Sequence, residues 1–142
     1  MKKILIVNAN YYNDVSSNLV LSAKKKLKSH KIKSSIIKVP GVFEIPITIR
    51  KYIKKFDGFI ALGCVIKGQT PHFDLICRST FVSIMNISVK YNKPIGNGII
   101  TSLTKQQALA RSSLSKKKLK PNKGFEAANA VVSVFINEPK NL

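Results

Sequence analysis

Short apolar runs alternate along this chain with longer segments in which apolar residues return every three or four positions. The short runs predict β-strands at residues 4–9, 32–39, 59–66 and 94–101. The helical spacing predicts helices at residues 15–29, 43–55, 73–91, 104–112 and 124–137. Neither an internal repeat nor a low-complexity linker interrupts this alternation, so we expect a single domain over residues 1–142.

Repeated strand–helix units predict a parallel sheet, because two parallel strands cannot be joined by a tight hairpin. We therefore expect an α/β fold: three α/β/α layers around a four-stranded parallel sheet, with flavodoxin-like topology. Ligands of such sheets bind beyond the carboxyl ends of the strands. That rule directs attention to residues 8–12, 39–44, 64–72 and 96–98.

The predicted helix at residues 73–91 has two apolar stripes. The first stripe contains Phe73, Ile76, Cys77, Phe81, Ile84 and Met85, and the second contains Leu75, Val82 and Val89. The sheet accounts for one stripe. Either a neighbouring subunit or a larger core within the chain must account for the other, and the pattern alone favours neither.

The formal net charge of +19 raises nucleic acid as a partner. However, only three of the 25 basic residues are arginines, and lysines cluster at 24–28, 51–55 and 116–120 with Tyr52 as the single aromatic residue among them. A solvated lysine surface is therefore the favoured interpretation, with non-specific polyanion binding at low salt. A basic α/β nucleic-acid-binding module remains the alternative hypothesis, and it predicts selective binding that survives physiological salt.

The N-terminus is basic, but the apolar run that follows it is only four residues long, much shorter than the core of a signal peptide. No stretch is long enough to span a membrane. Cys64 and Cys77 both lie in apolar segments, as expected for buried free thiols in a reducing compartment. We expect a cytoplasmic protein without a membrane partner.

An apolar strand runs directly into a glycine turn and a helix start at residues 63–74. Thr70 is a suitable helix N-cap, Pro71 suits the first helical position, and Asp74 is favoured by the helix dipole. Backbone N–H groups of residues 68–70 would then face a bound anion. His72 lies within one turn of that anion and can exchange protons near neutral pH.

Common nucleotide and metal motifs are absent from the sequence. There is no G-x-G-x-x-G, no G-x-x-x-x-G-K-[ST], no zinc-ligand spacing, and no carboxylate pair in the loop at residues 8–13. That loop also lacks a Ser/Thr-rich phosphate turn, which argues against a flavin carrier unless the purified chain holds stoichiometric flavin. We expect no metal and no cofactor. What remains at the strand ends is Tyr11, Tyr12, Glu44, the anion cradle and His72, each of which also has an ordinary structural explanation.

Three stretches at these positions resemble the lumazine synthase family, and the resemblance extends over residues 4–135. They are residues 39–46 (VPGVFEIP), 61–74 (ALGCVIKGQTPHFD) and 122–128 (NKGFEAA). The family implies a transferase of riboflavin biosynthesis that acts without a cofactor. It joins 5-amino-6-(D-ribitylamino)uracil to 3,4-dihydroxy-2-butanone 4-phosphate and releases phosphate and water.

The resemblance also implies roles for individual residues. His72 matches the histidine that transfers protons, and Tyr11, with Tyr12 as the alternative, matches an aromatic residue that stacks on the pyrimidine. The other residues matched to the pyrimidine and its ribityl chain are Gly41, Val42, Phe43, Glu44, Cys64, Val65, Ile66 and Asn97. Those matched to the butanone phosphate are Gly68, Gln69, Thr70, Arg111 and Lys123, of which Arg111 and Lys123 come from the adjacent subunit.

A homo-oligomer with active sites shared between subunits follows from the resemblance. Residues 112–121 form a longer connection than in shell-forming relatives and carry Lys116, Lys117, Lys118 and Lys120. The chain also begins at its first predicted strand. Both features favour a pentamer or a decamer over an icosahedral shell.

Overall fold

The computed structural model describes residues 1–115 and 122–137, and within these ranges strands and helices alternate. The strands are β1 (Lys3–Ala9), β2 (Lys33–Val39), β3 (Gly58–Ile66) and β4 (Ile95–Ser102). The helices are α1 (Asn13–Ser29), α2 (Ile45–Lys51), α3 (His72–Tyr91), α4 (Lys105–Arg111) and α5 (Lys123–Ile136), with a 3-10 turn, η1 (Val42–Glu44), before α2.

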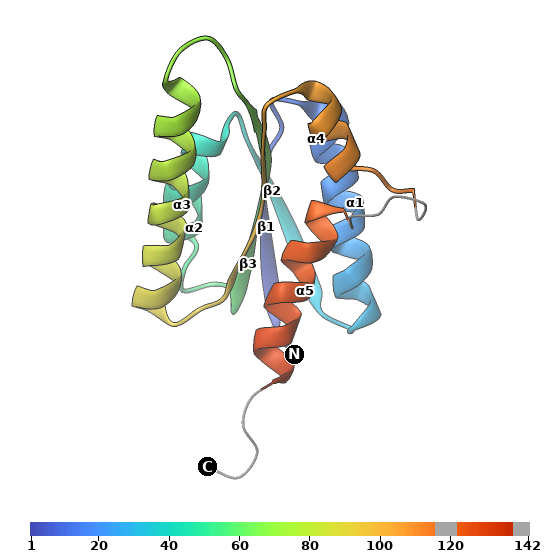
Figure 1. Cartoon of the computed structure of the whole chain (residues 1–142). Coiled ribbons are helices and arrows are strands. Elements are labelled where there is room, and N and C mark those ends of the chain that lie inside the picture. The colour runs from blue at the N-terminus through green and yellow to red at the C-terminus, as the bar shows by residue number, and fades with distance from the viewer. Residues whose placement is uncertain (116–121, 138–142) are drawn as a thin grey trace.

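The strands form one parallel sheet in the order β2-β1-β3-β4. Helices α2 and α3 cover one face of the sheet, and α1, α4 and α5 cover the other (Figure 1). The predicted three-layer α/β/α fold with flavodoxin-like topology is therefore confirmed. The order also makes β2 and β4 the edge strands, so the outer side of β4 is free of any described strand.

The core has two parts because side chains alternate between the faces of a strand. Ile4 and Ile6 of β1 pack with α1 and α5, whereas Leu5 and Val7 pack with α2 and α3. All four side chains are buried. This double burial explains why the first strand reads as a continuous apolar run and not as an alternating one.

The helix predicted at residues 43–55 is shorter than expected. It begins as the 3-10 turn η1, continues as α2, and ends at Lys51. Beyond that point the carbonyl groups of Ile53 and Phe56 accept hydrogen bonds from Lys93 Nζ, at 2.5 and 2.8 Å. The side chain of Lys93, two residues after the end of α3, thus binds the turn that follows α2.

The prediction that Thr70 caps α3 is wrong. The helix begins at His72 with Pro71 as its N-cap, and no side chain caps it. Pro71 has φ −70° and ψ 5°, which leaves it outside the regular helix, while its carbonyl accepts the first helical hydrogen bond from Leu75 N at 3.2 Å.

The two stripes of α3 differ in burial. Ile84 of the first stripe is buried against the sheet, but Met85 is 64% exposed, so its place in that stripe was wrongly predicted. Met85 stands three and four positions from Val82 and Val89, and it therefore shares their face of the helix. Leu75, Val82 and Val89 are 64%, 53% and 74% exposed, so no larger core formed by the described residues covers the second stripe.

Within the described ranges, no helix is both long enough and apolar enough to cross a lipid bilayer.

Candidate functional site

A cavity of about 550 Å³ lies at the carboxyl ends of β1, β2 and β3, beside the first turn of α3. It is the place where the parallel topology predicts a ligand. Its lining residues are Ala9, Tyr11, Tyr12, Gly41, Val42, Phe43, Glu44, Cys64, Val65, Ile66, His72 and Ile76.

Tyr11 and Tyr12 form an aromatic wall of this first cavity. Their ring centroids are 4.9 Å apart in an edge-to-face arrangement. Tyr12 packs against the core and lies under Lys105, whose Nζ is 4.7 Å from the ring centroid. Burial raises the pKa of the Tyr12 hydroxyl, and the adjacent Tyr11 and Cys64 raise it further against the effect of Lys105. Tyr12 is therefore the fixed ring, and Tyr11, 74% exposed, is the one that can reach a ligand.

The turn after β2 brings a carboxylate to the cavity. Val42 is buried and anchors the turn, and Gly63 of β3 allows this close approach, because a Cβ there would lie 2.8 Å from Val42 Cγ1. Glu44 N donates to Gly41 O at 3.2 Å. The Glu44 carboxylate lies back over Gly41, with both oxygens within 4 Å of the place a Cβ would occupy. Carboxylate oxygens that can accept hydrogen bonds thus lie at the wall of the cavity.

The end of β3 forms the floor of the first cavity. Cys64 is 7% exposed, and burial raises the pKa of its thiol to about 11, despite the opposing effects of Lys105 and of a hydrogen bond with Ser102. The thiol is therefore neutral at physiological pH and unsuited to nucleophilic chemistry. Cys64, Val65 and Ile66 are left to act through their shape and their backbone groups.

His72 is exposed at the first position of α3 and lines the cavity. The tip of the loop that precedes His72, by contrast, lies outside the cavity. Gly68, Gln69 and Thr70 are exposed and line neither this cavity nor the one described below. They lie in the loop that arches between β3 and α3 at the top of Figure 1, and no atom lies within 4 Å of the place of a Gly68 Cβ.

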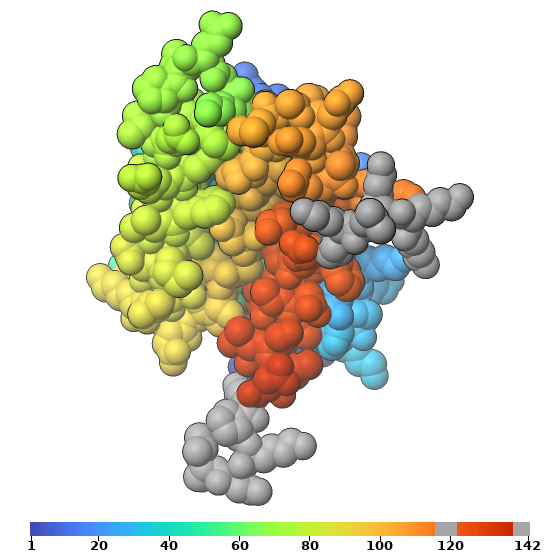
Figure 2. Space-filling model, in the orientation of Figure 1, coloured from blue at the N-terminus to red at the C-terminus, as the bar shows by residue number. Residues whose placement is uncertain are grey.

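A second cavity, of about 270 Å³, lies along the outer edge of the sheet at β4. Figure 2 shows this face, with β4 between α3, in green to yellow, and α4 and α5, in orange to red. The lining residues are Phe81, Asn97, Ile99, Ile100, Thr101, Arg111, Lys123 and Glu126, and none of them lines the first cavity.

Two cations define the chemistry of the second cavity. Arg111 is the last residue of α4, and its Nη1 lies 3.5 Å from Gln107 O. Lys123 is the first residue of α5, and its Nζ lies 3.3 Å from the Glu126 carboxylate. Gly96 lets α5 approach β4, because a Cβ there would overlap the carbonyl oxygen of Ala127. A guanidinium and an ammonium that line the same cavity suit a phosphate group.

The structure thus divides the residues predicted for the site into three groups. The first cavity collects His72 with Tyr11, Gly41, Val42, Phe43, Glu44, Cys64, Val65 and Ile66. Asn97, Arg111 and Lys123 meet in the second cavity, and residues 68–70 join neither. Asn97 therefore lies with the cations and not with the group to which the sequence assigned it. Its Oδ1 accepts a hydrogen bond from Ile99 N at 3.1 Å.

Several lining residues were not predicted from the sequence. Ile76 and Phe81 belong to a stripe of α3 that is typical of core residues, so no sequence signal separates them from other packing positions. Glu126 could have been found, because it lies one helical turn after Lys123 within the stretch at residues 122–128.

Comparisons with known proteins give one consistent result. Residues 1–137 match the family model described as 6,7-dimethyl-8-ribityllumazine synthase. A protein of that name from Methylorubrum populi is 37% identical over 140 residues, which cover 94% of this chain and 80% of the relative. One from Campylobacter jejuni is 40% identical over 138 residues, covering 94% and 87% of the two chains. One from Campylobacter curvus is 39% identical over 146 residues, covering 99% and 90%.

Proposed function

The chain belongs to the 6,7-dimethyl-8-ribityllumazine synthase family, and from this premise we propose that it condenses 5-amino-6-(D-ribitylamino)uracil with 3,4-dihydroxy-2-butanone 4-phosphate. The products are 6,7-dimethyl-8-ribityllumazine, phosphate and water, and the step is the penultimate one of riboflavin biosynthesis. The observation that carries the proposal is the first cavity. It brings together an aromatic wall, a carboxylate, the end of β3 and His72 at the carboxyl ends of the strands.

The pyrimidine and its ribityl chain occupy the first cavity. Tyr11 stacks on the flat ring, and the Glu44 carboxylate accepts hydrogen bonds from ribityl hydroxyls. Backbone groups of residues 41–43 and 64–66 line the rest of the first cavity. Rigid strands and a buried anchor at Val42 hold these groups in place before the substrate arrives, which lowers the entropy cost of binding.

The butanone phosphate is held by groups from two subunits. Residues 68–70 of one subunit offer backbone N–H groups beside His72, and Arg111 and Lys123 of the neighbour supply positive charge. This arrangement is supported by the separation of the two cavities, since the described residues of one chain do not bring the cations to His72. Asn97 lies with the neighbour's cations and faces the pyrimidine from the other side.

The reaction needs only proton transfers and charge stabilisation. The pyrimidine amine attacks the ketone and water leaves; phosphate is then eliminated, and the ribityl-bearing nitrogen closes the ring with loss of a second water. His72 moves protons during these steps, and Arg111 with residues 68–70 stabilises the departing phosphate. Holding both substrates together removes much of the bimolecular entropy cost.

Association of subunits is head-to-tail in this account, because two different surfaces of the chain must meet at each site. Such a contact generates a ring when the rotation closes. We infer a pentamer or a pair of pentamers. The exposed stripe Leu75, Val82 and Val89 of α3 supports this assembly, as an apolar face that the described residues of one chain leave uncovered.

A direct assay tests the proposal. The purified protein is mixed with both substrates, lumazine formation and phosphate release are followed, and the native mass is measured on the same sample. Equal amounts of lumazine and phosphate above the uncatalysed background are expected. Product formation at the background rate would overturn the proposed function.

A further inference from the structure

Asn122 is a buried polar side chain that lines neither cavity, yet it makes the densest set of hydrogen bonds near the second one. It is 8% exposed and immediately precedes α5. Its Oδ1 accepts hydrogen bonds from Gly124 N at 2.8 Å and Phe125 N at 3.2 Å. Its Nδ2 donates to Ser112 O at 2.8 Å, and to Ser113 O and Asn18 O at 3.4 Å each.

The hydrogen bonds of the Asn122 side chain serve two functions. The oxygen caps the start of α5, as many short polar side chains do. The nitrogen reaches back to the carbonyl groups at the end of α4 and to α1. An amide accepts with its oxygen while it donates with its nitrogen, whereas a carboxylate only accepts.

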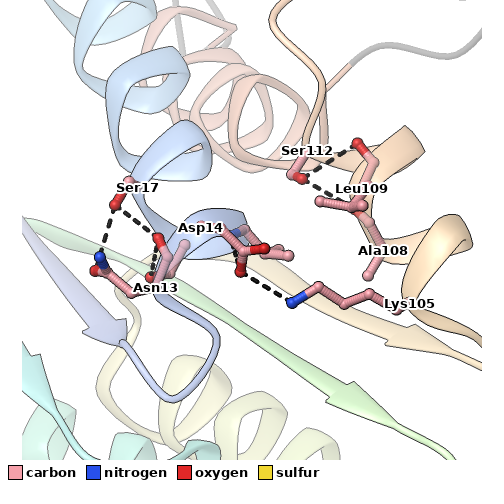
Figure 3. Close-up of polar contacts among 9 residues, drawn as sticks. Asn13, Asp14, Ser17, Lys105, Ala108, Leu109 and Ser112 are labelled. Carbon is pink, nitrogen blue, oxygen red and sulfur yellow. Dashed lines mark hydrogen bonds and ion pairs between the residues drawn. The ribbon is translucent and has the colours of Figure 1, made fainter.

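The end of α4 is arranged to receive this contact. Ser112 is fully buried, and its hydroxyl turns back to donate to Ala108 O at 2.9 Å and Leu109 O at 3.3 Å (Figure 3). The backbone carbonyl of Ser112 accepts the hydrogen bond from Asn122 Nδ2. The start of α5 is likewise fixed, since a Cβ on Gly124 would overlap the carbonyl oxygen of Leu19 in α1.

The residues next to these two anchors are the two cations of the second cavity. Arg111 precedes Ser112, and Lys123 follows Asn122. The side chain of Asn122 thus connects the backbone that carries the guanidinium to the backbone that carries the ammonium. Within residues 1–115 and 122–137, the one hydrogen bond of the Arg111 guanidinium is the long contact with Gln107 O, at 3.5 Å, so these residues restrain the side chain little.

We propose that Asn122 is a positioning residue, which holds Arg111 and Lys123 at one spacing so that both cations bind the same phosphate group. The proposal rests on the proposed function for the role of that phosphate in the butanone substrate. It assigns to Asn122 an effect on phosphate affinity, transmitted through Arg111, that is separate from its role as a helix cap.

Substitution by serine separates the two roles. In Asn122→Ser the hydroxyl still caps α5, but it is too short to donate to the end of α4. Asn122→Asp also keeps the cap and turns a carboxylate toward the Ser112 and Ser113 carbonyls, which it cannot bind. Asn92→Ala is the matched control for stability, because Asn92 holds a left-handed conformation (φ 55°) at the far end of α3.

The measurements are the KM for each substrate, kcat, and the Kd for inorganic phosphate, all on the assembled protein. In Asn122→Ser the KM for the butanone phosphate and the Kd for phosphate should both rise about tenfold, and kcat should fall by less than it does in Arg111→Ala, while the KM for the pyrimidine stays within about twofold. Asn122→Asp should show a larger rise. Asn92→Ala should lower the melting temperature with both phosphate constants unchanged.

A double variant shows whether the effect passes through Arg111. If it does, Asn122→Ser adds little to the loss already caused by Arg111→Ala. Unchanged phosphate constants in Asn122→Ser, or full additivity with Arg111→Ala, would overturn the positioning role while lumazine formation by the unaltered protein upheld the proposed function. If the unaltered protein formed no lumazine, the proposed function would fail, and the phosphate Kd values would still decide the role of Asn122.

Discussion

His72 carries the proton-transfer role in this account, and its exposed position at the start of α3 makes it easy to substitute without disturbing the core. We expect His72→Ala to slow turnover by about ten- to a hundredfold and to leave measurable activity, because substrate proximity is retained. His30→Ala is the matched control, since His30 is exposed at the end of α1, outside both cavities. Full turnover in His72→Ala, measured as kcat, would remove this residue from the mechanism.

Cys64 gives the folded protein a distinct response to alkaline pH. Burial raises the pKa of its thiol from 9.0 to about 11. Between these values the unfolded chain loses the proton first, so the folded state holds more protons and the free energy of unfolding falls as pH rises. The stabilisation is fully present below pH 9 and is lost as pH rises through about 11. It amounts to at most about 2–3 kcal/mol.

Urea unfolding of the unaltered protein and of Cys64→Ala, below pH 9 and near pH 11, measures this effect. The fall in stability should be smaller in Cys64→Ala, because alanine does not titrate. The raised pKa of Tyr12 acts in the same direction but is present in both proteins. Identical falls would show that the Cys64 thiol is not desolvated in the folded state.

At the residue scale the sequence predicts chemistry well where a short stretch carries several groups together. Gly41 and Glu44 were predicted from one such stretch, and they lie together in the first cavity. Thr70 and Met85 were misjudged for a different reason. Whether Pro71 begins or precedes the helix, and which side of α3 a methionine joins, depends on angles that only the packed helix sets.

At the element scale, α4 packs into the core through the buried Ala108, and two polar contacts of very different character hold its ends. Asn122 anchors its end from a buried position, whereas Lys105 at its start reaches Asp14 of α1 with a 3.0 Å ion pair (Figure 3). The ion pair is solvent-exposed, with side chains 42% and 58% accessible. The hydrogen bond from Lys105 lowers the pKa of the Asp14 carboxyl.

We expect Asp14→Asn to lower the free energy of unfolding by no more than about 1 kcal/mol at neutral pH, because exposed ion pairs are screened by water and salt. Urea unfolding at low and high ionic strength measures the change, which should shrink as salt is added. A loss as large as that of Asn122→Ser, undiminished by salt, would contradict the view that the buried amide is the main anchor of α4.

Element order and type followed from periodicity, and all four strands were predicted to within one residue at either end. The exception was the segment after β2. Val42 at its 3-10 start packs against β3, and the turn after α2 is bound by Lys93 from beyond α3, and neither contact is local in sequence. The second cavity was not predicted for the same reason, since it joins β4 to Phe81 of α3, which precedes it, and to α4 and α5, which follow it.

At the scale of the whole molecule, the exposed stripe of α3 should be an interface between subunits. Val82→Lys places a charge in its centre, and we expect it to reduce the native mass and lumazine formation together, because a charge is costly to bury. Leu21→Lys is the control, since Leu21 is a comparably exposed apolar residue on α1, at 57%. An intact native mass in Val82→Lys would place the interface elsewhere.

The claim that each active site is shared between two subunits has a direct measurement. His72→Ala and Arg111→Ala chains are coexpressed in equal amounts, and lumazine formation by the mixed assemblies is assayed at low butanone phosphate concentration. In a head-to-tail ring about a quarter of the interfaces would join an intact His72 to an intact Arg111. Activity near a quarter of the unaltered protein is therefore expected. Activity no greater than the mean of the two single variants would contradict the shared site.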